Sequence, residues 1–191
     1  MGKKLILASG SPRRQKLLRQ IGLAFTVDPS TVEESYDAAL PPGRIVENLS
    51  RLKAVQVAER HPEGIVIGAD TLVLLDGQVL GKPSGPAEAV RMLGMLSGRT
   101  HEVYTGFCLI VNPGGKTLSD HEVTHVTFRD LDPAEIEAYV RSGSPMDKAG
   151  AYGIQDDFGA IFVEKIHGCF YNVVGFPLTR FYVRYREMSL E

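Results

Sequence analysis

The sequence lacks the features by which several classes of protein are recognised. It has no tryptophan and only two cysteines among 191 residues. Cys108 and Cys169 form no CxxC pair, so no zinc knuckle or dithiol redox motif is visible. No hydrophobic run approaches the roughly 20 residues needed to cross a bilayer, and the apolar stretch at residues 5–8 is too short for a signal peptide. We expect a cytoplasmic protein with no membrane partner.

The chain also lacks an excess of either charge. Its 21 basic and 23 acidic residues give a formal net charge of -2. A broad basic surface for nucleic acid is therefore not expected. No Walker loop, GxGxxG fingerprint or Gly-x-Ser-x-Gly elbow is present, and the five histidines do not cluster. A solvent-facing pair of His121 and His125 is favoured over a metal site.

What is present is an alternation of helical and strand patterns. Hydrophobic residues make up 43% of the chain, enough for a proper core. We predict strands at 5–8, 65–68, 71–75, 78–80, 101–111, 117–128 and 160–166. We predict helices at 12–20, 44–60, 86–96, 133–142 and 177–188, and a long loop at 144–160. Crossovers mixed with hairpins indicate an α/β fold with a mixed sheet, in a single domain over residues 1–191.

The first candidate site lies between the first strand and the first helix. Ser9, Ser11, Arg13 and Arg14 surround a turn at the expected helix start. Free backbone N–H groups, the positive end of the helix dipole and two guanidinium groups suit a phosphate. The same residues also fit an ordinary capped helix with solvated arginines. The pattern thus predicts either an anion cradle or plain capping.

The second candidate site centres on Asp70, the one ionisable side chain in residues 65–75. A carboxylate there is costly to bury unless a cation, a metal or hydrogen bonds compensate it. The alternative is a strand-end aspartate that caps a turn. The Asp76-Gly77 hairpin signal places Lys82 opposite Thr71, beside this segment. Strict alternation puts Lys82 and Asp70 on opposite faces, so a bulge near Gly81 would be needed to bring them together.

Further charged residues fit the second site. Lys53 lies on the apolar stripe of its helix, where its ammonium either snorkels to solvent or points into a cleft. Glu33 and Glu34 lie in a loop whose sequence shows no other pattern, and spacing alone predicts that both side chains are solvated. Both interpretations of the lysine remain open at this point.

The third candidate site is the segment 147–157, which combines glycines, acids, a lysine and Gln155. Magnesium in nucleotide sites is usually held by a few carboxylates together with the substrate's phosphates. A flexible polar loop is the alternative. The Gln155 amide carries both a hydrogen-bond donor and an acceptor.

Taken together, these motifs resemble the Maf family of nucleotide pyrophosphatases. The matching pieces occur in the family's order along nearly the whole chain. They are Leu7-Ala8-Ser9, Ser11-Pro12-Arg13-Arg14, Lys53-Ala54, Ile67-Gly68-Ala69-Asp70-Thr71, Gly81-Lys82-Pro83, Leu96-Ser97-Gly98, the run from Asp147 to Gln155, and Tyr171-Asn172-Val173-Val174-Gly175-Phe176-Pro177. Departures occur at Asp156-Asp157, where many relatives have a shorter glycine turn, and at Cys169-Phe170 and Phe176.

The resemblance implies an ITPase-like α/β fold, with an elongated mixed β-sheet flanked by helices and two lobes with a central cleft. It implies a divalent metal cation (Mg²⁺ or Mn²⁺), a nucleotide substrate and, commonly, a homodimer. Asp70 matches the proton acceptor, and Arg13, Thr71 and Gln155 match the positions that mark the dTTP/UTP branch. The other family site positions match Ser9, Glu33, Lys53 and Lys82.

The function that follows is hydrolysis of dTTP and UTP to the monophosphate and pyrophosphate. Arg13, Lys53 and Lys82 would neutralise the triphosphate, and Asp70 would accept the proton of water or hold the metal. Glu33 would be a second metal or water ligand. The alternative function is a non-catalytic nucleotide-binding regulator of cell division. A phosphatase is disfavoured because no cysteine-containing phosphate loop is present, and a nucleic-acid-binding module is disfavoured by the charge.

Overall fold

The computed structural model describes residues 3–155 and 158–189, and it has the expected α/β architecture. The chain divides into two compact units. Unit 1 comprises Met1–Thr71, Thr105–Glu122 and Gly175–Glu191, and unit 2 comprises Leu72–Tyr104 and Val123–Val174. Asp156 and Asp157 of the third candidate site lie outside the described residues.

Among the described residues, seven strands form one sheet in the order β2-β1-β3-β5-β6-β7, with β4 paired to β3. β1 is parallel to both β2 and β3, whereas β4 and β7 are antiparallel to their neighbours. The prediction of a mixed sheet is therefore confirmed. The strands are β1 Leu5–Leu7, β2 Phe25–Val27, β3 Gly64–Leu75, β4 Gln78–Leu80, β5 Thr100–Asn112, β6 Lys116–Phe128 and β7 Val163–His167.

The helices begin where capping residues and prolines occur together. Ser11 caps α1 by accepting a hydrogen bond from the Arg14 N–H, and Pro12 takes the first position. Asp132 and Glu135 form a capping box at the start of α4. The α-helices are α1 Pro12–Gln20, α2 Pro42–Ala58, α3 Pro86–Leu96, α4 Pro133–Arg141, α5 Phe170–Val174 and α6 Leu178–Ser189. Three 3-10 helices, η1 Ser144–Asp147, η2 Ala149–Ala151 and η3 Phe158–Phe162, lie between α4 and β7.

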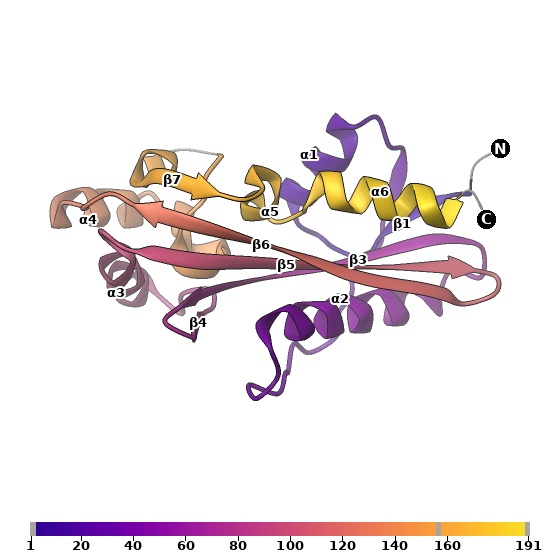
Figure 1. Ribbon diagram of the computed structural model, residues 1–191. Helices are drawn as coiled ribbons and strands as arrows, with labels where there is room; N and C mark the ends of the chain where they lie inside the picture. The colour runs from indigo at the N-terminus through magenta and orange to yellow at the C-terminus, as the bar shows by residue number, and fades with distance from the viewer. Residues whose placement is uncertain (1–2, 156–157, 190–191) are drawn as a thin grey trace. The chain divides into compact units, whose positions relative to one another are not determined.

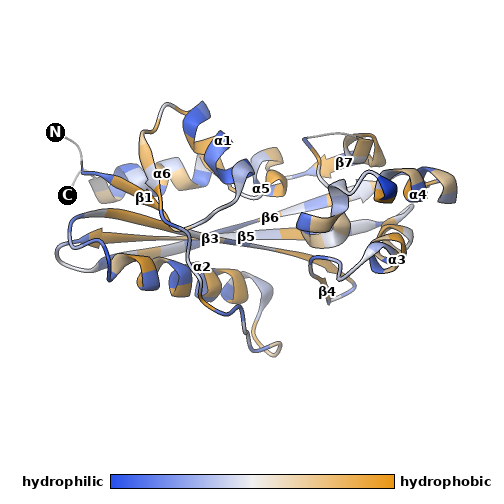
Figure 2. Ribbon diagram, turned by 180° about the vertical axis from the view of Figure 1, so that it is seen from behind, coloured by the Kyte–Doolittle hydropathy of each residue, from blue (hydrophilic) through white to orange (hydrophobic). Residues whose placement is uncertain are grey.

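In unit 1, helices cover both faces of the sheet. α1 and α6 lie on one face and α2 lies on the other (Figure 1). Toward α6, the Phe107 ring of β5 packs against Phe176 and Phe181, with centroids 6.2 and 5.7 Å apart. Toward α2, the core contains Ile6, Val66 and Val57, each with no exposed surface. Hydrophobic and hydrophilic residues alternate along α2 (Figure 2), as expected of an amphipathic helix.

Glycines allow α2 to approach the strands of unit 1 unusually closely. A Cβ atom at Gly68 of β3 would lie 2.1 Å from the Ser50 carbonyl oxygen, and one at Gly106 of β5 would lie 2.5 Å from the Val46 carbonyl. On the helix itself, a Cβ at Gly43 would lie 2.3 Å from the His121 ring. Only hydrogen fits at these points, so the glycines set the distance between α2 and the sheet.

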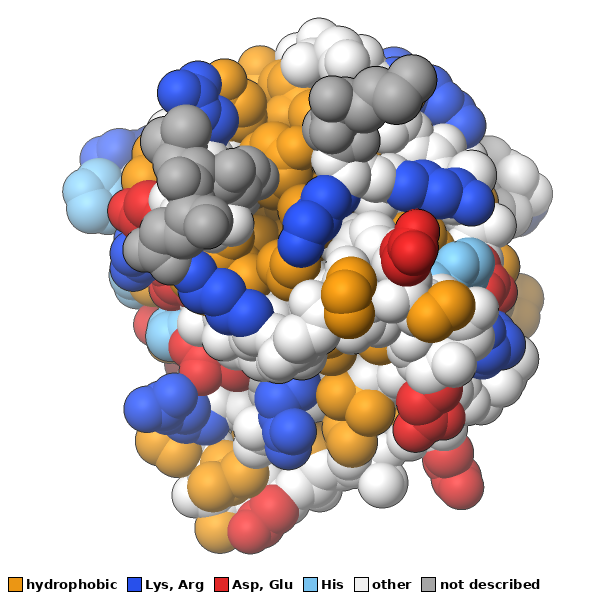
Figure 3. Space-filling model, turned by 90° about the vertical axis from the view of Figure 1, so that its right-hand side faces the viewer, with side chains coloured by type: hydrophobic (Ala, Val, Ile, Leu, Met, Phe, Trp, Pro, Cys, Tyr) orange, Lys and Arg blue, Asp and Glu red, His pale blue; other side chains and the backbone are white. Residues whose placement is uncertain are grey.

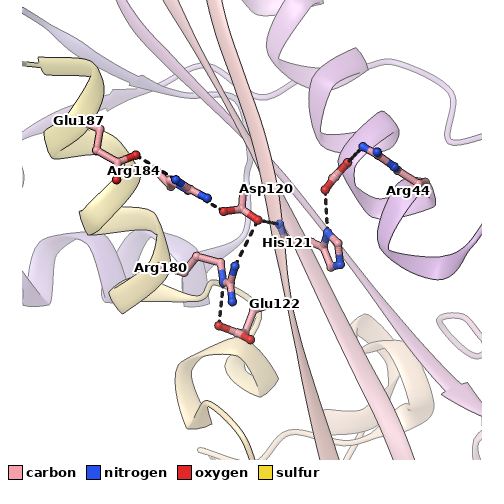
Figure 4. Close-up of polar contacts among 8 residues, drawn as sticks. Arg44, Asp120, His121, Glu122, Arg180, Arg184 and Glu187 are labelled. Atoms are coloured by element: carbon pink, nitrogen blue, oxygen red, sulfur yellow. Dashed lines mark hydrogen bonds and ion pairs between the residues drawn. The ribbon is translucent and has the colours of Figure 1, made fainter. Parts of the chain in front are cut away.

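Neighbouring residues of β6 hold the two helical layers of unit 1 from opposite sides (Figure 4). The Asp120 carboxylate accepts hydrogen bonds from Arg184 at 2.8 Å and from Arg180 at 3.4 Å, both on α6. The next side chain, His121, lies with Nδ1 2.7 Å from the Glu47 carboxylate on α2. Because successive side chains of a strand point to opposite faces, this strand contacts both layers.

In unit 2, α3 and α4 pack together and an aromatic cluster fills the core. The Phe128 ring of β6 packs edge-to-face on Tyr152, with centroids 4.7 Å apart. Tyr139 of α4 packs in the same manner on Phe162, with centroids 5.2 Å apart. Tyr152 belongs to the third candidate site, so that segment packs on this aromatic core.

The structure corrects the sequence prediction in several places. The predicted strands 65–68 and 71–75 are one strand, β3, so Asp70 lies inside a strand and does not follow one. The predicted loop 144–160 contains η1 and η2, and η3 runs from it to Phe162, so the predicted strand 160–166 begins only at Val163. β2 and α5 were not predicted. The 3-10 turns are only three to five residues long, too short for hydrophobic periodicity to indicate them.

Basic and acidic side chains are interspersed over the face shown in Figure 3, with hydrophobic side chains between them. In the part of the chain that the structure describes, none of the helices combines the length and the hydrophobicity required of a membrane span.

Candidate functional site

The residues of the candidate site in unit 1 lie around the level at which the parallel strands β1 and β2 end, while β3 continues past it. Leu7, the last residue of β1, pairs with Val27 of β2 and with Ile67 of β3. Beyond this level β1 turns into α1, β2 runs into the segment 28–41, and β3 continues to Asp70. In sheets of this kind ligands bind outside the carboxyl ends of the strands. Topology thus gathers the first and second candidate sites of the sequence analysis in one region.

The turn from β1 into α1 is organised by two serines. The Ser9 hydroxyl accepts a hydrogen bond from the Ser11 N–H at 3.3 Å, and the Ser11 hydroxyl accepts one from the Arg14 N–H at 3.5 Å. The start of α1 therefore faces this region with its positive dipole end. Arg13 is half-buried on the first turn, next to Arg14.

The Arg14 side chain joins three separate segments of unit 1. Its Nε donates to the Gly175 carbonyl oxygen at 3.0 Å, Nη1 donates to Ser9 Oγ at 3.0 Å and Nη2 donates to Thr71 Oγ1 at 3.1 Å. Burial lowers the pKa of Arg14 and the Asp70 carboxylate opposes that effect. Three of the five guanidinium donors are thus used to arrange neighbouring protein groups.

Gly175 is a site residue that sequence reasoning did not single out. Its φ of 116° is one that side chains rarely adopt, and a Cβ atom there would lie 3.6 Å from Thr71 Oγ1. The glycine is therefore suited to bring a backbone carbonyl up to the Arg14 guanidinium. Its only signal in the sequence is its place in Gly175-Phe176-Pro177, between α5 and α6.

Asp70 and Lys53 form a buried ion pair. Lys53 Nζ lies 2.5 Å from Asp70 Oδ1, and the two residues are 8% and 5% exposed. Burial raises the pKa of Asp70, while the charges of Lys53 and Arg14 act against that rise. A carboxyl with a raised pKa in a polar site is suited to accept and release a proton.

The Lys53 ammonium also contacts a second carboxylate. Its Nζ lies 2.6 Å from Glu34 Oε1. Of the two interpretations of this lysine, the structure therefore supports the one in which the ammonium points into the site. Glu34 was expected to be solvated and instead pairs with Lys53, although its side chain stays half exposed. The neighbouring Glu33 is exposed on the same segment, and its role stays a prediction.

Two further candidate residues belong to unit 2. The β3–β4 hairpin has the predicted register, with Leu75 opposite Gln78, but β4 ends at Leu80 and the pairing does not reach Lys82. Lys82 is exposed on the segment that follows. The Gly150 N–H donates to the Gly81 carbonyl at 3.1 Å, which joins this segment to the third candidate site.

The segment that carries Gln155 is held by buried polar groups. Lys148 Nζ donates to the Ser144 carbonyl at 2.5 Å and to Asp147 Oδ1 at 2.9 Å. His101 Nε2 lies 2.7 Å from the Tyr152 hydroxyl. These contacts lie next to half-buried Gln155 in sequence, and they favour a structured segment over a flexible polar loop at residues 144–155.

His101 predicts how stability depends on pH. Burial lowers its pKa to about 4 from the 6.5 of an unperturbed histidine. The unfolded chain therefore binds a proton that the folded protein excludes, and stability falls as pH falls from 6.5 toward 4. We expect this residue to reduce the free energy of unfolding by about 2 kcal/mol between pH 7 and pH 5.

Urea denaturation at the two pH values measures this effect. The control is His101→Gln, which keeps an amide near the Tyr152 hydroxyl and does not titrate. The variant should lose about 2 kcal/mol less than the original chain on acidification. Equal losses in the two proteins would show that His101 is not the residue responsible.

One group of potential metal ligands occurs among the described residues. Atoms of Glu47, Asp120 and His121 lie within 4.8 Å of one another. The two carboxylates also contact Arg44, Arg180 and Arg184, as Figure 4 shows. Because arginine already neutralises these acids, we assign the group a role in joining β6 to α2 and α6.

Comparison with known proteins gives full-length matches. A sequence profile of the family described as Maf-like protein matches residues 4–188. The chain is 54% identical over 177 residues to the dTTP/UTP pyrophosphatase of Moorella thermoacetica, covering 93% of this chain and 91% of the relative. It is 48% identical over 189 residues to the dTTP/UTP pyrophosphatase of Bacillus cereus, covering 99% of this chain and 92% of the relative.

Among solved structures, the chain is similar to the Staphylococcus aureus Ham1 protein, with a TM-score of 0.48 and 16% sequence identity. The match covers 67% of this chain and 73% of that chain.

Proposed function

The chain belongs to the Maf-like protein family, and we propose that it is a nucleoside triphosphate pyrophosphatase that converts dTTP and UTP to the monophosphate and pyrophosphate. The observation that carries the proposal is the buried Asp70–Lys53 pair, 2.5 Å apart, on β3 and α2 beside the carboxyl ends of β1 and β2. A proton acceptor and a cation side by side are what hydrolysis of a phosphoanhydride requires. The two relatives described above, 54% and 48% identical to this chain over most of its length, are named dTTP/UTP pyrophosphatase.

In the proposed reaction a water molecule attacks the α-phosphorus of the nucleotide. The new bond joins the water oxygen to that phosphorus, and the bond from the α-phosphorus to the oxygen bridging to the β-phosphorus breaks. The proton of the water passes to the Asp70 carboxylate, and pyrophosphate leaves with the electron pair of the broken bond. The raised pKa of Asp70 suits it to this proton transfer.

Charge on the triphosphate is balanced by groups of unit 1. The start of α1 offers backbone N–H groups and a positive dipole end, and Arg13 lies on its first turn. Lys53 would exchange Glu34 for a phosphate oxygen while keeping its contact with Asp70. We propose a further cation for the triphosphate from Lys82, a prediction that rests on the family motif.

A divalent cation fits the donor chemistry of this region. Asp70 and Glu34 both direct carboxylate oxygens at one positive charge, the Lys53 ammonium, and Glu33 lies beside them. Hard oxygen donors of this kind suit Mg²⁺ or Mn²⁺, which usually bind one or two carboxylates together with substrate phosphates. We propose Glu33 as a protein ligand, with Asp70 as a second ligand in the alternative in which it holds the metal and does not accept the proton. The bound ion would neutralise charge on the phosphates and lower the pKa of water.

Gln155 is the residue we propose to read the base. Its amide can donate to one atom and accept from the next, as the edge of uracil or thymine requires. Gln155→Ala should therefore reduce the preference of kcat/KM for dTTP and UTP over purine nucleotides by about tenfold, with an unchanged melting temperature. If the order of preference among the nucleotides is unaltered, Gln155 does not take part in base recognition.

The proposal as a whole is tested by one assay on the purified protein. A panel of nucleoside triphosphates is incubated with Mg²⁺ or Mn²⁺, and pyrophosphate and orthophosphate are measured separately. We expect pyrophosphate from dTTP and UTP. Release of orthophosphate would indicate a phosphatase, preference for purines would place the chain in another branch, and binding without turnover would support a regulator.

A further inference from the structure

A second threonine lies behind Thr71 in unit 1. Thr105 of β5 has no exposed surface, and its hydroxyl oxygen lies 3.0 Å from that of Thr71. Thr71 is half-buried and follows Asp70 directly in the chain. Its hydroxyl accepts a hydrogen bond from Arg14 Nη2 at 3.1 Å. The Thr71 hydroxyl is thus held between a buried hydroxyl on one side and a guanidinium on the other.

The hydrogen-bonding capacity of a hydroxyl limits what Thr71 can offer to a ligand. A threonine hydroxyl has one proton to donate and two lone pairs that accept. Because arginine only donates, the Arg14 contact uses one lone pair. If Thr105 donates to Thr71, both lone pairs are filled and the Thr71 proton is directed to a third partner. If Thr105 accepts, the proton is consumed and one lone pair is left.

The hydroxyl of Thr105 is not required for packing. Thr105 and Phe107 lie two positions apart on β5, so their side chains point to the same face of the sheet. On that face Phe107 packs on Phe176 and Phe181. Valine has nearly the shape of threonine and would fill the same position, with a strand propensity at least as high. A hydroxyl at a fully buried strand position therefore indicates a polar role, and the Thr71 hydroxyl lies within hydrogen-bonding distance of it.

We propose that Thr105 is a positioning residue that donates to Thr71 and so directs the Thr71 hydroxyl, as a donor, toward an acceptor oxygen of the bound nucleotide. The proposal rests on the proposed function, since a nucleoside triphosphate presents acceptor oxygens on its phosphates and on its pyrimidine carbonyls. Thr105 acts through Thr71 and touches no substrate atom itself.

The test compares Thr105→Val with Thr105→Ser in the pyrophosphatase assay. Loss of one oriented hydrogen bond should raise KM for dTTP and UTP about three- to tenfold in Thr105→Val, with little change in kcat. Thr105→Ser keeps the hydroxyl and should restore KM to within about twofold of the original value. The dissociation constant of a non-hydrolysable dTTP analogue should follow the same order.

A double-mutant cycle then separates an effect through Thr71 from a general effect on the fold. Thr71→Val should raise KM by itself, and adding Thr105→Val to it should change KM no further, because the partner is already absent. Melting temperatures of all variants are measured alongside. Should Thr105→Val fold poorly, Thr105→Ala removes the same hydroxyl without adding a methyl group.

The outcomes distinguish this inference from the proposed function. If the original chain hydrolyses dTTP or UTP and Thr105→Val keeps its KM, only the role of Thr105 is overturned. Additive effects of the two valine substitutions would also overturn it. If the original chain neither hydrolyses nor binds these nucleotides, the proposed function fails first and the role of Thr105 fails with it.

Discussion

Asp70→Asn is expected to lower kcat for dTTP and UTP by about a hundredfold or more, the usual scale for the loss of an acid–base group. The substitution keeps the shape of the side chain and removes its capacity to hold a proton from water. Lys53 keeps its contact with Glu34 at 2.6 Å, so its charge is not left without a partner. The melting temperature should therefore stay close to that of the original chain.

Asp76→Asn is the matched control for this prediction. Asp76 lies at the tip of the β3–β4 hairpin with a positive φ of 50°, which asparagine adopts readily. The same chemical change there should leave kcat unaltered. Unchanged turnover in Asp70→Asn would remove Asp70 from the chemistry.

The pH profile of the original chain gives an independent readout of Asp70. A general base works only when it is deprotonated, so kcat/KM falls as the pH drops below the pKa of that base in the substrate-free protein. Because burial raises the pKa of Asp70, the acidic limb of the profile should lie above the range of an ordinary aspartate. A limb at or below pH 3.8, the ordinary value for this group, would contradict the assignment.

Gly68→Ala should damage both stability and turnover, although Gly68 contacts no substrate. The new Cβ atom would lie 2.1 Å from the Ser50 carbonyl oxygen and 2.9 Å from the Ala54 nitrogen, both in the backbone of α2. α2 must then move away from β3 and take Lys53 with it. We expect a loss of about 2–3 kcal/mol in the free energy of unfolding and a fall in kcat of about a hundredfold, the scale of a 1 Å misplacement.

Gly94→Ala is the control for the glycine substitution. Gly94 lies in α3, and a Cβ atom there would meet nothing within 4 Å. Alanine is the better helix former, so stability should rise by up to about 1 kcal/mol with normal turnover. Urea denaturation and steady-state kinetics measure both variants. A Gly68→Ala protein as stable and active as Gly94→Ala would show that the close contact at α2 does not set the site.

Local signals predicted much of the fold. Ser11, Pro12 and Gly22 indicate the bounds of α1, and the helix begins and ends as predicted, at Pro12 and Gln20. Asp76-Gly77 predicts the hairpin, and both residues have the positive φ that its tight turn requires. These features depend on neighbours in sequence, which is why a single sequence reveals them.

Contacts between distant segments were harder to predict. Spacing could not tell whether Glu33 or Glu34 faces Lys53, because the segment 28–41 has no regular period from which to infer direction. Thr105 resembles any threonine in a strand, and only the fold brings it to Thr71. β2 is three residues long and half exposed, so it carries too little hydrophobic pattern to be recognised. The family motifs supplied most of the proposed site residues, but not Thr105, which we propose orients one of them.

The consecutive residues Asp120 and His121 limit how the neighbouring hairpin can vary. One contacts arginines of α6 and the other contacts Glu47 of α2, from opposite faces of β6. A slip of β6 by one residue would turn the Asp120 carboxylate toward the Glu47 carboxylate and would take it away from the arginines of α6, so the ion pairs on that face would be lost. Insertions at the turn between β5 and β6 should therefore be tolerated, in evolution or in engineered variants, only where the added residues form a longer loop and the register of β6 is unchanged.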